Sequence, residues 1–122
     1  MSADLELARR FLSVLATVAN TGERELLYPF LASDVEWVMP RRELHGIDEV
    51  RRELTWITPP ERFDLEFEVL RIEELGGGRL VTDVHELYRA KGTGEVAHTR
   101  DRRIELIIRN GEVCRYEMRV VG

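Results

Sequence analysis

Four residues in the second half of the chain have side chains suited to acid–base chemistry. Asp83 and His85 lie two positions apart in one segment, and Asp101 and Arg103 lie two positions apart in another. A carboxylate beside an imidazole orients the ring and raises its basicity, so His85 with Asp101 would form a general base that works near neutral pH. Arg103 would stabilise a developing oxyanion, and Asp83 would be a supporting acid. The alternative is ordinary cross-strand ion pairing, which is common and weak.

The turn that follows the first segment predicts how the two segments pair. A loop at residues 91–95 contains two glycines, and we expect Ala90 to lie opposite Val96 across it. Counting back from that pair gives three complementary pairs: Asp83 with Arg103, His85 with Asp101, and Glu86 with Arg100. A slip of one residue would move every side chain to the other face, so this agreement supports the register.

The last hairpin turns at Asn110-Gly111, a dipeptide typical of a two-residue turn between strands. Counting from this turn places Ile107 opposite Cys114 and Arg103 opposite Met118. The two registers predict one continuous face on which the four candidate catalytic residues lie with three from the last strand: Cys114, Tyr116 and Met118. The other face holds Val84, Glu86, Tyr88, Arg102, Ile104, Leu106, Ile108, Arg115, Glu117 and Arg119. Both faces are mixed, and the pattern leaves open which of them is concave.

Five large side chains are suited to lining a pocket for a mostly apolar molecule: Tyr28, Trp37, Met39, Tyr116 and Met118. Trp37 and Met39 follow Val35 at alternate positions of an expected strand, so these three share one face. The alternative is plain core packing, because a fold of this size needs some of these residues in its interior whether or not a cavity remains.

The composition is typical of one globular domain over residues 1–122. The chain is 43% hydrophobic and 34% charged, and its net charge of -5 disfavours nucleic acid as a partner. We expect no membrane span, because no apolar run approaches the roughly 20 residues that a span needs. The start of the chain is acidic, unlike a signal peptide. A single cysteine excludes an internal disulfide and suits a reducing cytoplasm.

The sequence predicts neither a metal nor a cofactor. Its three histidines lack paired ligand spacing, and no Cys-x-x-Cys motif is present. The triple glycine at residues 76–78 precedes an expected strand and not a helix, so it indicates a turn and not a phosphate-binding loop.

The elements that must position these residues follow from the spacing of apolar side chains. An amphipathic helix is expected over residues 5–19, a short helix over 23–28 with a further turn after Pro29, and a third helix over 46–57. One strand follows Asp34, and four more follow residue 62 as a meander, the first with a bulge near Leu70. This order predicts an α+β fold.

Three segments resemble the nuclear transport factor 2-like superfamily: Asp34-Val-Glu-Trp37, the helix start at Gly46-Ile-Asp-Glu-Val50, and the closing hairpin Arg109-Asn-Gly-Glu-Val113. SnoaL-like polyketide cyclases, ketosteroid isomerases and limonene-epoxide hydrolases are its nearest branches. The resemblance implies a cone-shaped, cystatin-like fold with three N-terminal helices on a strongly bent, mixed but mostly antiparallel sheet. It also implies an apolar pocket and a homodimer, often paired through the outer sheet surface.

The resemblance does not carry a complete catalytic set. The Asp–Arg–Asp triad of the epoxide hydrolases would fall at Asp83, His85 and Met118, where the residue types differ. The resemblance does place Met118 inside the cone, and the predicted register then favours the same side for Asp83, His85, Asp101 and Arg103.

We therefore expect binding of a small, mostly apolar molecule, with cofactor-free acid–base chemistry such as isomerisation, cyclisation, dehydration or epoxide hydration. One alternative is a non-catalytic ligand-binding or dimerisation module whose cone is filled by its own side chains. Another is a subunit that needs a partner protein, with Trp56 on the interface.

Overall fold

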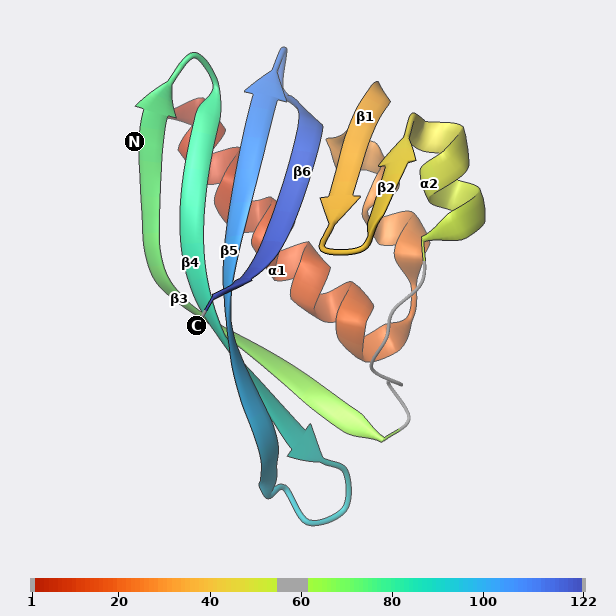
Figure 1. Cartoon of the computed structure of the whole chain (residues 1–122), viewed down its shortest axis with the longest axis vertical. Helices are drawn as coiled ribbons and strands as arrows, with labels where there is room; N and C mark the ends of the chain where they lie inside the picture. Colours follow the sequence, from red (N-terminus) through yellow and green to blue (C-terminus); the bar gives the residue numbers. More distant parts are fainter. Residues whose placement is uncertain (1, 55–61, 122) are drawn as a thin grey trace.

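The computed structural model describes residues 2–54 and 62–121. Its elements follow one another as α1 (Ala3–Thr21), the one-turn 3-10 helices η1 (Arg24–Leu26) and η2 (Tyr28–Phe30), β1 (Leu31–Met39), β2 (Arg42–His45), α2 (Ile47–Glu53), β3 (Phe63–Gly76), β4 (Arg79–Ala90), β5 (Val96–Arg109) and β6 (Glu112–Val121). The strands form one sheet in the order β2-β1-β6-β5-β4-β3 (Figure 1). All neighbours are antiparallel except β1 and β6, which are parallel. The fold is α+β, as expected.

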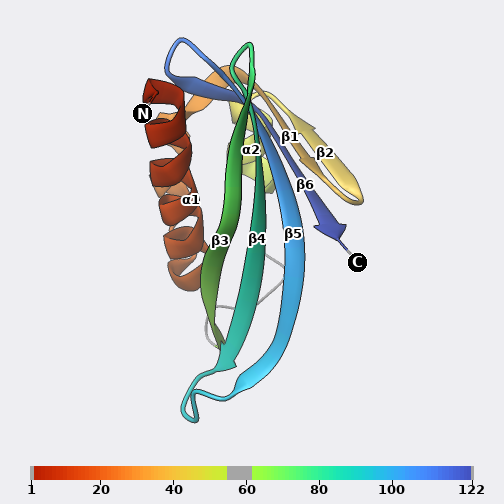
Figure 2. The same ribbon diagram turned by 90° about the vertical axis from the view of Figure 1, so that its left-hand side faces the viewer.

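Helix α1 lies against the concave side of the bent sheet (Figure 2). The hydroxyl oxygen of Ser2 accepts a hydrogen bond from the backbone N–H of Leu5 at 3.0 Å and so caps the start of the helix. Gly22 ends the helix with a left-handed φ of 76°, a conformation that glycine adopts without a Cβ clash. Between these ends, the apolar residues at helical spacing are buried: Leu7, Ala8, Phe11, Leu12, Leu15 and Val18. This stripe forms one wall of the core.

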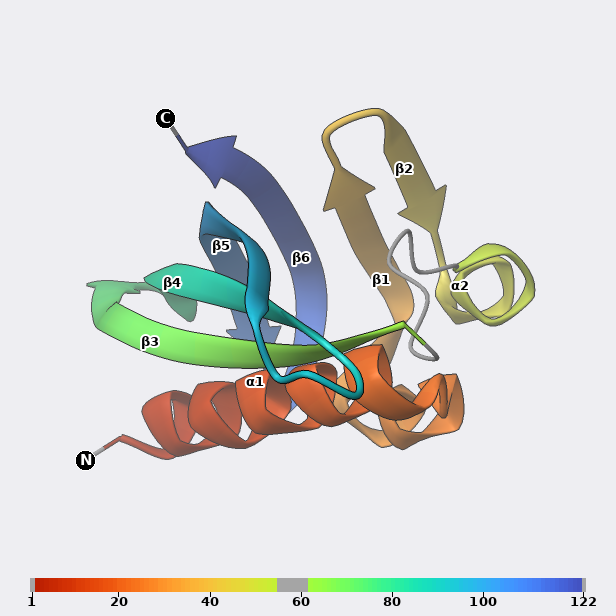
Figure 3. The ribbon, with the colours of Figure 1, turned by 90° about the horizontal axis from the view of Figure 1, so that it is seen from below.

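The sheet curls around α1 when it is seen from below (Figure 3). The bulge expected near Leu70 is confirmed, because the register of β3 against β4 shifts between Val69 and Arg71. Such a bulge bends a strand and increases its twist. The largest buried side chains fill the space between the helices and the concave face, among them Phe11, Leu15, Trp37, Leu44, Ile104 and Leu106.

The predicted pairing of β4 with β5 is confirmed over the residues that matter for the site. Asp83 lies opposite Arg103, His85 opposite Asp101, and Glu86 opposite Arg100. The predicted start of that hairpin is wrong by one residue, because Val96 pairs with Arg89 and not with Ala90. The register shifts between Tyr88 and Arg89, so the predicted pairs agree with the observed ones from Tyr88 back along β4.

The predicted pairing of β5 with β6 is wrong beyond the turn. Ile108 pairs with Val113 as expected, but Ile107 then pairs with Arg115, so Cys114 is an extra residue in β6. From this bulge onward every partner moves by one, and Met118 lies opposite Ile104 and not opposite Arg103. A shift of one residue exchanges the two faces of a strand. Tyr116 and Met118 therefore do not share a face with Arg103.

Three further predictions about the elements need correction. The helix predicted over residues 23–28 is a single 3-10 turn, η1, whereas the separate turn predicted at Pro29 is present as η2. The third helix ends at Glu53, because Leu54 is already extended, and residues 55–57 of the predicted helix, including Trp56, lie outside the described residues. A strand at Arg42–His45 was not expected because it is short and largely polar, and it forms by pairing with β1. In the described part of the chain, no helix has the length and apolar character needed to cross a membrane.

Candidate functional site in the concave face of the sheet

A cavity of about 90 Å³ lies between α1 and the concave face of the sheet. Its walls come from one helix and five strands and are mostly apolar. They are formed by Leu15, Ala19, Trp37, Met39, Phe63, Leu65, Phe67, Glu86, Tyr88, Arg100, Arg102, Ile104, Tyr116 and Met118. The cavity therefore lies where the elements converge, and a few polar side chains share it with aromatic and aliphatic ones.

The polar end of the cavity is a buried ion pair between Glu86 on β4 and Arg102 on β5. The Arg102 Nε donates a hydrogen bond to Glu86 Oε1 at 2.7 Å, and the Tyr88 hydroxyl donates to the same oxygen at 3.1 Å. The two charged side chains are only 8% and 10% exposed. Arg102 Nη1 donates to the thioether sulfur of Met118 at 3.0 Å, and sulfur is a weak acceptor.

The pKa values of two groups reflect this burial. Burial alone would lower the pKa of Arg102, but the hydrogen bonds and charges of Glu86 and Tyr88 outweigh it, and the pKa is raised above its usual value. Burial also raises the pKa of the Tyr116 hydroxyl, and the negative charge of Glu86 raises it further. Arg102 is therefore a permanent cation in the cavity, and Tyr116 stays neutral well above neutral pH.

Two stacked aromatic rings form another part of the cavity lining. The rings of Trp37 and Tyr116 are stacked, with centroids 4.0 Å apart and planes 18° apart, and Phe11 meets both edge-on. Trp37 is 1% exposed, and among the described residues its indole N–H has no hydrogen-bond partner. A buried N–H without an acceptor is unfavourable, so Trp37, which lines the cavity, has one donor still to be satisfied.

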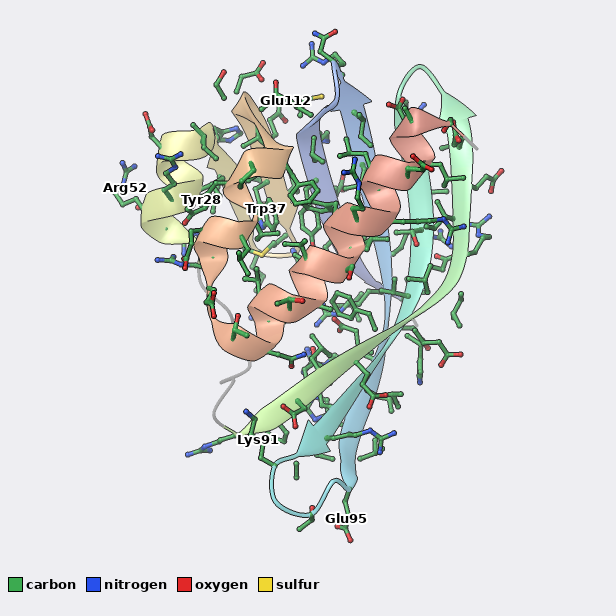
Figure 4. The ribbon with its side chains drawn as sticks, turned by 180° about the vertical axis from the view of Figure 1, so that it is seen from behind. Tyr28, Trp37, Arg52, Lys91, Glu95 and Glu112 are labelled. Atoms are coloured by element: carbon green, nitrogen blue, oxygen red, sulfur yellow. The ribbon has the colours of Figure 1, made fainter. Side chains whose placement is uncertain are left out.

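The structure brings four of the five predicted pocket residues around this cavity: Trp37, Met39, Tyr116 and Met118. Tyr28 does not line it. The Tyr28 ring instead packs under the guanidinium of Arg51, whose central carbon is 5.1 Å from the ring centroid. Figure 4 shows Tyr28 beside α2, apart from the side chains gathered beneath α1. The sequence did not indicate this cation–π contact.

The four predicted catalytic residues lie on the outer face of the sheet. Their pairs are confirmed as contacts: His85 Nδ1 is 2.6 Å from Asp101 Oδ1, and Arg103 Nε donates to Asp83 Oδ1 at 2.9 Å. Because side chains alternate along a strand, these residues point away from the face that holds Glu86 and Arg102. Their expected place beside Met118 is wrong, and the bulge at Cys114 is the reason. Their catalytic roles stay predictions.

Arg100 lies two residues before Arg102 on the same face of β5 and is exposed at the edge of the cavity. It lies directly opposite Glu86 in the register, yet Glu86 binds Arg102. Among the residues that the structure describes, Arg100 makes no hydrogen bond or ion pair. It is therefore a cation available to a ligand.

The sequence did contain a signal for the site that we missed. On β5, Ile104, Leu106 and Ile108 have the same parity as Arg102, and this is the more apolar of its two faces. A concave face packed under a helix needs such a run of aliphatic side chains. The alternation of apolar residues along β5 alone would have placed Arg102 on the concave face and Arg103 on the outer face.

A second hollow, of about 430 Å³, lies between α1 and β3. It is an open groove lined by Arg9, Leu12, Ser13, Ala16, Thr17, Asn20, Phe67, Val69 and Ile72. Asn20 fixes one end, because its amide donates to the Leu65 carbonyl oxygen at 2.9 Å and accepts from the Leu65 N–H at 2.5 Å. Within the described part of the chain, no three His, Cys, Asp or Glu side chains gather as metal ligands here or elsewhere.

No protein-family model and no curated protein matches the sequence. Solved structures do match. A nuclear transport factor 2-like protein from Anabaena variabilis has a TM-score of 0.79 at 13% identity, covering 98% of this chain and 90% of that one. A putative SnoaL-like polyketide cyclase from Jannaschia sp. CCS1 has a TM-score of 0.71 at 14% identity, covering 97% and 85%. TerC, co-crystallised with polyporic acid, has a TM-score of 0.70 at 19% identity, covering 98% and 92%. The chain therefore has the nuclear transport factor 2-like fold.

Proposed function

We propose that the protein binds a small, mostly apolar molecule in the cavity beneath α1, with the polar end of that molecule at Arg102. The observation that carries this proposal is the buried pair of Glu86 and Arg102 in a cavity with apolar walls. Removing two charges from water is unfavourable, and aliphatic residues of similar volume would often stabilise a fold equally well. A ligand that uses the guanidinium would explain why the pair is there.

The size of the cavity limits the ligand. An apolar cavity of about 150 Å³ binds benzene, so the 90 Å³ present here is too small for a six-membered ring unless side chains move. Met39 and Met118 line the walls, and unbranched thioether side chains change shape with little strain. We infer that these two residues move aside when a ring enters.

Structures of the same fold support a small-molecule role. TerC was crystallised with polyporic acid, and the Jannaschia protein is named as a putative polyketide cyclase. These ligands and activities belong to those proteins. They favour a ring-containing ligand for this chain because the fold offers a concave sheet under a helix in each case.

A second candidate is proton transfer at a carbon next to a carbonyl group. Glu86, Tyr88 and Arg102 supply a carboxylate, a phenol and a fixed cation at one end of an apolar cavity. Arg102 would polarise the carbonyl oxygen, and Glu86 would take the adjacent proton. Acetophenone in deuterated water gives a direct test, because its methyl protons should exchange with solvent in the unaltered protein and not in Glu86→Gln. Exchange that is no faster than in buffer would remove this candidate and leave binding intact.

The indole N–H of Trp37 offers a test of binding itself. The chain has two tryptophans, so the variant Trp56→Phe leaves one indole signal in a proton–nitrogen correlation spectrum. We expect benzamide to shift this signal in a saturable way, because Trp37 lines the cavity. A signal that neither benzamide nor its charged analogues benzoate and benzylammonium move at any concentration would contradict the proposal.

Two alanines on α1 provide a matched pair of variants. Ala19 lines the cavity, whereas Ala16 lines the open groove between α1 and β3. Ala19→Leu should fill the cavity and abolish the shift of the Trp37 signal, whereas Ala16→Leu should keep it. The reverse result would place the ligand in the groove.

We also propose that two copies pair through the outer surface of the sheet, as the resemblance implies. That surface has charges of both signs, including Asp83, Arg103, Glu105 and Arg119. A two-fold interface can bring such charges opposite one another. Sedimentation at low and high salt tests the pairing, since a dimer held by ion pairs should dissociate as salt rises. A monomer at low salt and high concentration would contradict it.

A further inference from the structure

We infer that the ligand of this cavity is an anion, a ring-containing molecule with one carboxylate or an equally acidic oxygen, and that Arg100 selects it. This inference rests on the proposed binding function. It concerns the charge of the ligand, which neither the fold nor the apolar walls determine.

The lining of the cavity has a surplus of positive charge. Arg100 and Arg102 line it, and Glu86 is the one carboxylate among its lining residues. The chain as a whole has a net charge of -5, so this local surplus runs against the balance of the protein. One positive charge left over at a cavity mouth is complementary to a ligand with one negative charge.

The surplus is located at Arg100. Glu86 neutralises Arg102 through a bond of 2.7 Å, although Arg100 is the residue directly opposite Glu86. Several other arginines of the sheet are engaged: Arg71 and Arg103 both bind Asp83, and Arg119 binds Glu105. Within the described residues Arg100 has no such partner. A ligand carboxylate at the mouth would supply one.

Arg102 can contribute a second hydrogen bond from inside the cavity. Its Nη1 donates to the sulfur of Met118, an acceptor much weaker than an anionic oxygen. A carboxylate oxygen would replace the sulfur and form a charge-assisted hydrogen bond, the stronger class of such bonds. Displacing Met118 would also enlarge the cavity on the side where the ring enters. Anion binding and ring binding are thus coupled through one side chain.

Three ring compounds of the same shape separate the effect of charge from that of the apolar ring: benzoate, benzamide and benzylammonium. Titrations on the Trp56→Phe protein, followed by the Trp37 indole signal, give a dissociation constant for each. We expect benzoate to bind about tenfold more tightly than benzamide, the effect of one charge-assisted hydrogen bond, and benzylammonium to bind most weakly. The preference for benzoate should shrink as salt is raised from low to about physiological ionic strength.

Arg100→Gln removes the proposed selecting charge from an exposed position, so we expect it to fold normally. It should bring the affinity for benzoate down to that for benzamide and leave the affinity for benzamide unchanged. Arg119→Gln is the matched control, since it removes one exposed guanidinium of β6 that binds Glu105 on the outer face. This control should keep the full preference for benzoate.

The outcomes separate the two proposals. If benzamide binds as well as benzoate, or if Arg100→Gln keeps the preference, the inference about charge is overturned while the binding function stands. Tighter binding of benzylammonium would overturn it in favour of a cation at Glu86. If none of the three compounds moves the Trp37 signal, the proposed function itself fails.

Discussion

Arg102 on β5 lies directly opposite Val84 on β4, but its guanidinium binds Glu86, two residues farther along β4. This diagonal contact takes Glu86 away from Arg100, its direct partner in the register. This diagonal contact therefore produces both the buried pair of Glu86 with Arg102 and the unpaired cation at Arg100. The electrostatics of the cavity depend on it.

Breaking the buried pair should destabilise the fold strongly. Arg102→Met would leave the carboxylate of Glu86 buried without its cation, and we expect a loss of about 3 kcal/mol in the free energy of unfolding. The double variant Glu86→Leu with Arg102→Met removes both charges and should recover most of that loss. Urea unfolding of the three proteins measures both values. A single variant as stable as the unaltered protein would mean that water reaches the pair.

Adjacent glycines in the β3–β4 turn should respond differently to alanine. A Cβ at Gly78 would lie 2.1 Å from the carbonyl oxygen of Ile108, whereas a Cβ at Gly77 would meet nothing within 4 Å. Both residues have a left-handed φ, so both variants carry backbone strain of about 1 kcal/mol. Gly78→Ala should lose considerably more stability than Gly77→Ala, because it also disrupts the hydrogen bond from the Ile108 N–H to the Gly78 carbonyl. Equal losses in thermal unfolding would contradict this close approach.

The buried hydroxyl of Tyr116 should make the protein sensitive to alkali. Burial raises the pKa of Tyr116 in the fold, whereas in the unfolded chain it is about 10. Above that pH the unfolded chain releases a proton that the folded protein keeps, so stability falls as pH rises. Tyr116→Phe should lose this part of the alkaline slope, up to about 1.4 kcal/mol per pH unit. Identical slopes above pH 10 in the two proteins would show that the hydroxyl ionises freely.

Asp83 should contribute to stability on the acid side. The hydrogen bond from Arg103 lowers the pKa of Asp83 despite partial burial, and Arg71 lowers it further. Its stabilising effect is therefore present above the ordinary value of about 3.9 and is lost as pH falls through the lowered pKa. Asp83→Asn should cost about 1 kcal/mol at neutral pH, and the difference should vanish in strong acid. Chemical denaturation across this range checks it, and a difference that persists in acid would assign the effect to packing.

Local patterns were sufficient for much of the fold. The period of the apolar residues predicted α1, and alternation predicted β3 together with its bulge at Leu70. Counting back from the loop at residues 91–95 predicted the pairing of His85 with Asp101, and complementary charges supported it, because the loop joins two strands that are adjacent in the chain. Strand β2 could not be predicted in the same way, since its four residues have little pattern of their own and depend on β1.

By itself, the sequence determined the order of α1, β1 and α2, the meander of β3 to β6, and most of the large side chains that fill the interior. Only the tertiary structure decided that Tyr116 and Met118 lie with Arg102 on the face of the sheet that closes on α1. That decision depends on one extra residue in β6, Cys114, which reverses the facing of Tyr116 and Met118 relative to Arg103. Both faces of β6 carry polar and apolar residues, so its sequence is consistent with either register. A bulge in such a strand cannot be recognised from the alternation of its residues. The packing of α1 on one face selects between them, and so places Glu86 and Arg102 in the cavity and His85 and Asp101 on the outside.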